Sequence, residues 1–269
     1  MRVAMATSPG AADRPNEDFV GATSGLVVVV DGAGIPDTEV ICRHGVAWYA
    51  DTLGSTLLSH WARRATIDLV ALLGQAIDEV AGRHRHTCDI ADPSSPQATV
   101  AMVAVDDERA NWLALADAFV ALDVVGAEPR VVTDGRELAV RREVLAPLEG
   151  LTLDTEEYER TRASAIDALR ARRNRPGGYW IAKDDPDAAA QAVTGSVPLV
   201  ELQGVAVLSN GVSRLVDPYR LLDWPAVIRH LRADGPDAIL GLLRDAEQTG
   251  RFGSSPDDAT VAFVDLQRR

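Results

Sequence analysis

Residues 26–34 read LVVVVDGAG, and this stretch decides how the rest of the chain is interpreted. Leu26 and the four valines after it predict a buried β-strand, and the run is far too short to span a bilayer. Asp31 ends the run, and the glycines that follow allow a sharp turn whose carbonyls can approach a ligand closely. Such a carboxylate suits a metal ligand or a catalytic acid, but an ordinary strand with an Asp-Gly turn explains the same residues.

Three further motifs place acidic or amide side chains beside short apolar segments. RPNED (residues 14–18) precedes the valine run, SNG (209–211) follows the apolar segment 204–208, and PDDAT (256–260) opens the segment 261–264. Each motif alone is weak evidence. Their order and spacing along the chain are specific, and they favour a site at which strand ends from distant segments meet.

In this order the motifs resemble those of the metal-dependent type 2C serine/threonine protein phosphatases. The family signatures run Arg-x-x-Asn-Glu-Asp, Asp-Gly-x-Gly, Gly-Asp-Ser, Ser-Asp-Gly and Asp-Asp-x-Thr. The resemblance extends from about Arg14 to Asp265, and CRHGVAWY (42–49) and GYW (178–180) place it nearest an actinobacterial branch. It implies a four-layer αββα sandwich of two antiparallel sheets flanked by helices.

The apolar periodicity independently favours an α+β fold, because helices and strands are segregated along the chain. Two amphipathic helices, over 38–60 and 65–83, are expected to cover one face of a sheet, and a charged helix is expected over 153–173. More helices are predicted within 217–248, and a first edge strand or arm within 1–13. The other strands are expected at 98–105, 111–116, 119–125, 129–133, 179–182, 197–201, 205–208 and 261–266.

Composition limits the partners and the organisation of the protein. The 269 residues carry a formal net charge of −13, so nucleic acid and anionic membranes are not expected as partners. Two cysteines do not make a disulfide framework, and no signal-peptide or membrane-span pattern is present, which favours a cytoplasmic protein. One phosphatase-like domain is expected over 1–269, with a flap-like segment at about 135–195 that shapes substrate access. The oligomeric state is left open.

The resemblance assigns metal ligands residue by residue. It implies that two Mn²⁺ or Mg²⁺ ions are bound and that Asp31 bridges them. Glu17 and the carbonyl of Gly32 are expected on the second ion, and Asp257 on the first. Hard divalent ions take such oxygen ligands, and a pair of them can clamp a phosphate ester for in-line attack.

Three more roles follow from the resemblance. Asp18 is expected to orient a metal-bound water, and Asp117 takes the place of an aspartate associated with a third, looser ion. Arg14 matches the arginine that grips the substrate phosphate, a role that suits a planar donor fork. Its spacing from Glu17 is one residue shorter than in many family members, so capping a surface turn is an alternative role.

The sequence departs from the family at three places. Asn210 stands where the family has a metal-ligand aspartate, Ala33 replaces a histidine that many bacterial members also lack, and residues 116–118 read ADA instead of Gly-Asp-Ser. An amide keeps one oxygen donor but loses a full negative charge, which weakens metal binding.

The expected function is hydrolysis of phosphate monoesters through a metal-bound hydroxide. The substrate would be a phosphoserine or phosphothreonine protein or a small phosphorylated metabolite. The alternative is a catalytically impaired pseudophosphatase that binds a phosphorylated partner or ligand, because Asn210 replaces a metal ligand.

Some other polar residues carry weaker expectations. Asp106, Asp107, Asp123 and Asp134 are expected to be solvated turn residues. The arginines at 172, 173 and 175 would either extend anion binding in the flap or form a solvated helix end.

A zinc site built from Cys42, His44, His84, His86 and Cys88 is a further alternative. Their spacing does not match a standard zinc finger, and Cys42 and His44 are expected on one helix, facing different sides. Buried cysteines and cations at a helix end are therefore the preferred interpretation.

Overall fold

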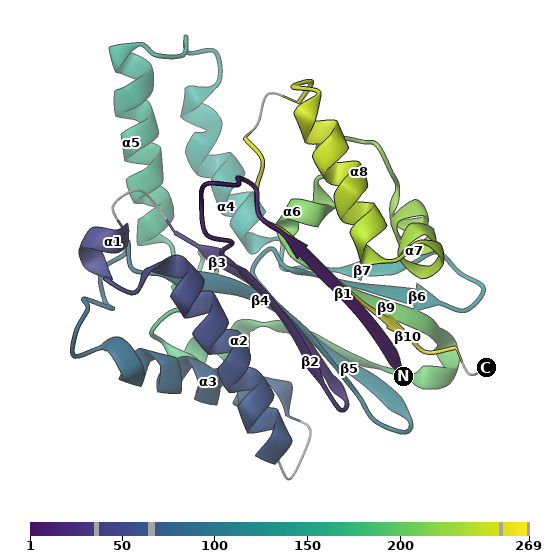
Figure 1. Ribbon diagram of the computed structural model, residues 1–269. Coiled ribbons are helices and arrows are strands. Elements are labelled where there is room, and N and C mark those ends of the chain that lie inside the picture. The colour runs from purple at the N-terminus through teal and green to yellow at the C-terminus, as the bar shows by residue number, and fades with distance from the viewer. Residues whose placement is uncertain (35–37, 64–67, 253–254, 268–269) are drawn as a thin grey trace.

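Two five-stranded antiparallel sheets pack face to face, and helices cover their outer faces (Figure 1). This computed structural model describes residues 1–34, 38–63, 68–252 and 255–267. It confirms the four-layer α+β sandwich. In spatial order, the first sheet consists of β1 (Arg2–Ser8), β10 (Ala259–Asp265), β9 (Leu202–Leu208), β6 (Phe119–Val124) and β7 (Arg130–Val132). The second consists of β2 (Asp18–Thr23), β3 (Leu26–Ala33), β4 (Gln97–Val105), β5 (Arg109–Leu115) and β8 (Val193–Pro198).

The helices are divided among three places in the molecule. α2 (Gly45–Arg63) and α3 (Leu69–His84) cover the second sheet, and α7 (Trp224–Ala233) and α8 (Pro236–Gln248) cover the first. α4 (Arg136–Leu145) and α5 (Glu156–Ala171) lie side by side and project beyond the end of the sandwich (Figure 1). The remaining elements are α1 (Thr38–Ile41), α6 (Asn210–Ser213) and 3₁₀ helices at Ala146–Leu148, Pro186–Gln191 and Leu199–Glu201. Among the described helices, none has the length and apolarity needed to cross a membrane.

Strand β3 belongs to two hydrophobic cores at once. Alternate side chains, beginning with Leu26, pack under α2 and α3, whereas Val27 and Val29 pack between the two sheets. All five residues from Leu26 to Val30 are fully buried, and burial of each such side chain contributes about 1.5–3 kcal/mol. Asp31 continues the face of Val27 and Val29, so it points into the space between the sheets at their end.

Two of the predicted strands are wrong in extent, and strand β2 and helix α4 were not predicted. Residues 179–182 form no strand but two isolated bridges, Ala182 with Ala98 and Tyr179 with Arg173. The Asn174 side chain bonds the backbone N–H and C=O of Ile181 and closes a loop there. The predicted strand 197–201 ends at Pro198, where a 3₁₀ helix begins. Helix α4 has no apolar stripe in the sequence, and among its residues only Val140 is buried.

The aspartates that were expected in solvated turns lie in two different environments. Asp106 caps its hairpin, because it accepts hydrogen bonds from the backbone N–H groups of Glu108 and Arg109. Asp123 and Asp134 were predicted to be solvated, which is wrong: their side chains are buried and are paired with arginines, Arg232 and Arg136 respectively. Arg232 is distant from Asp123 in the sequence, whereas Arg136 lies only two residues after Asp134, and the tertiary structure is what shows that Asp134 is buried.

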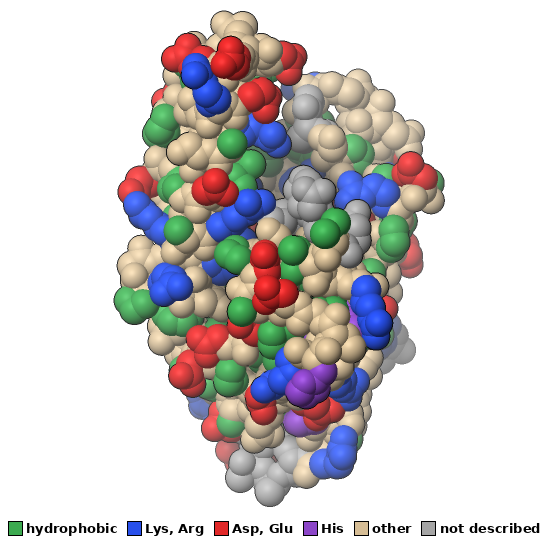
Figure 2. All heavy atoms as spheres, turned by 90° about the vertical axis from the view of Figure 1, so that its left-hand side faces the viewer, with side chains coloured by type: hydrophobic (Ala, Val, Ile, Leu, Met, Phe, Trp, Pro, Cys, Tyr) green, Lys and Arg blue, Asp and Glu red, His purple; other side chains and the backbone are tan. Residues whose placement is uncertain are grey.

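Figure 2 shows acidic and basic side chains interspersed over the face that carries α2 and α3. Acidic side chains gather at the tip of the projection formed by α4 and α5 (Figure 2).

Packing between α2 and β2 gives a test of the fold. A Cβ at Gly54 would lie 2.1 Å from the ring of Phe19, so Gly54→Ala should destabilise the protein by about 1–3 kcal/mol through overpacking. The matched control is Gly82→Ala in the exposed part of α3, where the nearest atom is 3.9 Å away and alanine should add about 0.5–1 kcal/mol. Urea unfolding of both variants measures the difference. Equal effects at the two positions would contradict this packing.

Candidate functional site

Two carboxylates meet at the end of the second sheet. Asp18 opens β2 and is the direct cross-strand partner of Asp31 in the register of β2 and β3. Cross-strand partners share one face of a sheet, so both side chains point between the two sheets. From the opposite sheet, Ser209 and Thr260 extend the inward faces of β9 and β10, and both are fully buried. The sandwich thus brings together residues that are far apart in sequence.

Asp18 is held in an unfavourable environment for a charged group. Its side chain is buried, and within the described part of the chain neither carboxylate oxygen has a hydrogen-bond partner. Burial raises its pKa to about 7, and the hydroxyls of Thr260 and Ser209 are near enough to offset this only in part, without a hydrogen bond of ordinary geometry. The negative charge of Asp258 adds to the rise.

Asp31 experiences the same effects more strongly. Burial raises its pKa well above the usual range, and the charges of Asp18 and Asp117 raise it further. One compensating contact comes from the backbone N–H of Asn210, which lies 3.4 Å from Asp31 Oδ2. An array of mutually repelling carboxylates is the electrostatic pattern expected of a site for cations.

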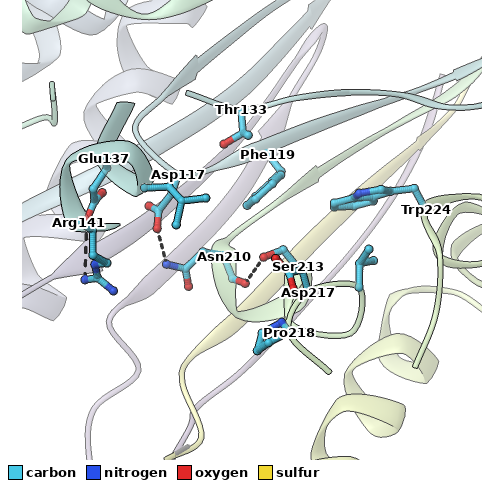
Figure 3. Close-up of a pocket in the computed structure, with 12 residues that line it drawn as sticks. Asp117, Phe119, Thr133, Glu137, Arg141, Asn210, Ser213, Asp217, Pro218 and Trp224 are labelled. Atoms are coloured by element: carbon cyan, nitrogen blue, oxygen red, sulfur yellow. Dashed lines mark hydrogen bonds and ion pairs between the residues drawn. The ribbon is translucent and has the colours of Figure 1, made fainter. Parts of the chain in front are cut away.

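Asp117 lies in the connection between β5 and β6, where the chain passes from one sheet to the other. The residue before it, Ala116, has a φ of 59°, in the left-handed region that favours glycine, which gives a physical reason for glycine in the family motif. Burial raises the pKa of Asp117, while a 2.8 Å hydrogen bond from Nδ2 of Asn210 lowers it (Figure 3).

The PDDAT motif contributes two carboxylates with different surroundings. Asp258 accepts hydrogen bonds from the backbone N–H groups of Gly10 (2.7 Å) and Glu17 (2.6 Å), so it fastens the N-terminal segment to the start of β10. Asp257 lies at the rim, half-exposed, and its carboxylate is 2.6 Å from the guanidinium of Arg214. The pairing of Asp257 with Arg214 was not anticipated from the sequence.

Glu17 and Gly32 lie together beside the two central carboxylates. The backbone N–H of Gly32 donates to the carbonyl of Glu17 at 3.0 Å, and a Cβ at position 32 would lie 2.5 Å from that oxygen. Only glycine permits this close approach. The approach fixes Glu17 at the edge of the cluster formed by Asp18 and Asp31.

Arginine placement differs from the sequence-based expectation. Arg14 is exposed in the loop between β1 and β2, and in the described ranges it forms no hydrogen bond or ion pair with the carboxylates. Arg141 of α4 instead lies near Asp117, where its charge lowers the pKa of that carboxyl. Sequence analysis missed Arg141, because its helix sits in the segment with no apolar pattern.

A cavity of about 390 Å³ opens next to Asp117 and Asn210. Figure 3 shows Arg141 and Glu137 of α4 on one side of it, with Phe119 and Trp224 on another. Burial and, to a smaller extent, the negative charge of Asp117 raise the pKa of Glu137 to about 7. The cavity therefore combines an apolar wall with a cation and a carboxyl that holds its proton near neutral pH.

The arginines after α5 are engaged in structural contacts. Arg172 forms an ion pair with Glu143 of α4 at 2.6 Å, and Arg173 donates to the hydroxyl of Tyr179 and to the carbonyl of Pro93. Of the three, Arg175 is exposed. Arg172 and Arg173 thus hold the projecting helices in place.

Comparison with known proteins gives the fold class. No family model and no curated protein matches the sequence. A bacterial serine phosphatase is 15% identical, covering 100% of this chain and 99% of its own, with a TM-score of 0.64. Serine/threonine phosphatase Stp1 from Staphylococcus aureus is 14% identical, with coverages of 99% and 95% and a TM-score of 0.62. The catalytic domain of the serine/threonine protein phosphatase PstP, in complex with two manganese ions, is 14% identical, with coverages of 98% and 97% and a TM-score of 0.58. This chain has the fold of these bacterial serine/threonine phosphatases.

The buried carboxylate Asp18 gives a pH test in metal-free protein. Its pKa is 3.8 in the reference state and about 7 when folded, so the folded state holds a proton that the unfolded chain releases. Stability should therefore fall as pH rises from about 4 to about 7. We expect Asp18→Asn to be more stable than the wild type at pH 8 in chelator, by roughly 1–3 kcal/mol, with the difference shrinking toward pH 4.

Thermal unfolding across this pH range checks the prediction. The exposed Asp13→Asn is the control and should follow the wild type. If Asp18→Asn also follows the wild type at every pH, Asp18 is not desolvated.

Proposed function

We propose that the protein is a metal-dependent phosphatase that hydrolyses phosphate monoesters at the carboxylate cluster. The convergence of Asp18, Asp31 and Asp117, each with a raised pKa, is the observation that carries this proposal. Divalent metal ions would neutralise these charges and satisfy the Asp18 oxygens, which have no hydrogen-bond partner. The donor set therefore fits hard cations such as Mn²⁺ or Mg²⁺.

The proposed ligands follow the positions of the donors. Asp31 would bridge two ions, with Glu17 and the Gly32 carbonyl on one of them and Asp257 on the other. Asp257 would have to exchange its contact with Arg214 for the metal. Asp117, held by Asn210, would bind a third and weaker ion. Two manganese ions in PstP, which shares the fold, support this choice of metal and number.

The chain's own groups have complementary tasks in hydrolysis. Bound divalent ions supply Lewis-acid stabilisation of phosphate charge and lower the pKa of water. Asp18 would orient the attacking water from its buried position. Arg141 would bind the phosphate oxygens with its planar donor fork, and Glu137 would donate its proton to the leaving oxygen.

The cavity next to Asp117 supports a proposal for the substrate. Phe119, Pro218 and Trp224 give it an apolar side that suits the group attached to the phosphate. A phosphoserine or phosphothreonine protein is favoured because the fold neighbours are serine/threonine phosphatases. A small phosphorylated metabolite is the alternative substrate.

Asn210 also favours a second candidate function, a pseudophosphatase that binds a phosphorylated ligand without cleaving it. Its Nδ2 donates to Asp117 and its backbone N–H points to Asp31, so the residue makes the contacts of a hydrogen-bond donor. As a metal ligand it would contribute only its uncharged amide oxygen. Activity measurements separate the two functions.

The test compares Asn210→Asp with the wild type. Asn210→Asp replaces a hydrogen bond to Asp117 with repulsion between two carboxylates, which a cation relieves. We expect the Mn²⁺ concentration for half-maximal hydrolysis of p-nitrophenyl phosphate to fall about ten- to hundredfold, with a smaller change in rate at saturating metal. The control Asp31→Asn should abolish activity in either background.

Two outcomes would count against parts of this proposal. Superimposable metal curves would mean that Asn210 is not a ligand. If neither the wild type nor Asn210→Asp hydrolyses the substrate, the phosphatase function is rejected and the pseudophosphatase function remains.

Arg141 and Arg14 are the two candidates for the arginine that binds the substrate phosphate. Loss of a charge-assisted hydrogen bond costs about 1.5–3 kcal/mol, so Arg141→Gln should raise KM for p-nitrophenyl phosphate and Ki for inorganic phosphate at least tenfold. Arg142→Gln, the next residue on α4 and exposed, is the matched control. Steady-state kinetics of these variants and of Arg14→Gln decide between the two arginines. If KM and Ki rise in Arg14→Gln alone, Arg14 binds the phosphate, as the sequence predicts.

A further inference from the structure

A second cluster of metal-binding side chains lies outside the carboxylate site, where the start of α2 meets the end of α3. It consists of Cys42, His44, His84 and Cys88. The ligand atoms of Cys42, His44 and His84 lie within 4.8 Å of one another. Cys88 joins them, since its Sγ is 3.3 Å from Nδ1 of His44. Both cysteines are free thiols.

The structure removes the argument against zinc that placed Cys42 and His44 on opposite sides of one helix. Helix α1 ends at Ile41 and α2 begins at Gly45, so Cys42 and His44 lie in the turn between them and not on one helix. The backbone N–H of Gly45 bonds the Cys42 carbonyl at 3.2 Å, and the φ of Gly45 is +80°. This turn lets both side chains converge, with Sγ of Cys42 3.7 Å from Nδ1 of His44.

The second half of the cluster comes from one turn at the end of α3. The backbone N–H of Cys88 donates to the carbonyl of His84 at 3.0 Å, which places residues four apart on the same side. Two segments, one reading Cys-x-His and one reading His-x-x-x-Cys, therefore each contribute one thiol and one imidazole.

The buried imidazole of His84 is independent evidence for a bound metal at this cluster. The residue is 3% exposed, and its Nδ1 is buried with no hydrogen-bond partner among the residues that the structure describes. Trp48 packs against both imidazoles, with ring centroids 4.4 Å from His44 and 5.1 Å from His84. A buried imidazole nitrogen that lacks a partner among the described residues is available as a metal ligand.

We propose that Cys42, His44, His84 and Cys88 form a tetrahedral zinc site that ties the start of α2 to the end of α3. In a tetrahedral zinc site, sulfur and nitrogen ligands lie about 3.5 Å apart, which the distances of 3.7 and 3.3 Å match closely. Two thiolates with two imidazoles favour Zn²⁺ over the hard ions of the carboxylate cluster. With four protein ligands the zinc is structural.

The site would also stabilise the turn that presents Asp31. Val46 follows the cluster directly, and Cβ atoms built at Gly32 and Gly34 would lie 2.7 and 2.5 Å from its side chain. The two glycines therefore pack against Val46 at the start of α2. Zinc bound to residues 42 and 44 would hold this contact in place.

The test begins with wild-type protein prepared with zinc and dialysed without chelator. We expect about one tightly held zinc per chain by elemental analysis, and two thiols that become reactive only when the zinc is released. Replacement by Co²⁺ should give a thiolate-to-cobalt charge-transfer band and the intense visible bands of tetrahedral cobalt. These bands distinguish the site from carboxylate-bound metal.

Variants identify which side chains bind the zinc. His84→Leu and Cys88→Ser should lose the zinc and the cobalt charge-transfer band, whereas His86→Leu, at an exposed position two residues from each, should keep them. Asp31→Asn should also keep them, because it alters only the carboxylate cluster. Circular dichroism verifies folding, and Cys88 is half-exposed, so Cys88→Ser remains informative if His84→Leu does not fold.

Specific results would overturn the zinc site. One is wild-type protein that, after zinc loading, holds no zinc and gives no cobalt charge-transfer band. Another is a Cys42–Cys88 disulfide that forms without metal and is unchanged by His84→Leu. Loss of zinc in Asp31→Asn with retention in Cys88→Ser would place the metal in the carboxylate cluster instead.

Discussion

Repulsion among buried carboxylates is the constraint on which this structure depends. Asp18 and Asp31 face each other across two paired strands, and Asp117 approaches from the connection between the sheets. Bringing such charges together without a cation destabilises the folded state. The sandwich tolerates the cluster because β3 is buried on both faces and belongs to two cores. Its rigidity keeps Asp31 in place despite the electrostatic cost.

Backbone contacts around the cluster hold its parts in register. The Asp258 carboxylate binds the N–H groups of Gly10 and Glu17, so the N-terminal segment is fastened to β10. Gly32 makes its close approach to the carbonyl of Glu17, and on its other side it meets Val46 of α2. Stability and site geometry are therefore linked, since the contacts that pack the sheets also orient the carboxylates.

The projecting helices complete the site from a different direction. α4 brings Glu137 and Arg141 to the cavity beside Asp117, and the pair of Arg172 with Glu143 secures α5 to α4. In this arrangement, a segment with almost no buried apolar side chains is held by ion pairs. Such contacts are weaker than core packing. A flap at about 135–195 that shapes substrate access stays a prediction.

The sequence by itself indicated the segregated helices and strands and the buried strand that carries Asp31, because apolar runs and strand-end motifs are local patterns. The resemblance to the type 2C phosphatases supplied the four-layer sandwich. It did not reveal α4, Arg141 or the pair of Asp123 with Arg232, since those depend on partners distant in the chain. The burial of Asp134 beside its near neighbour Arg136 depends on the surrounding tertiary packing. The loop at 179–182 escaped it for the same reason: a side-chain bond from Asn174 competes with the sheet. Tertiary structure also decided the meeting of residues 42, 44, 84 and 88, which two turns bring together and no spacing rule anticipates.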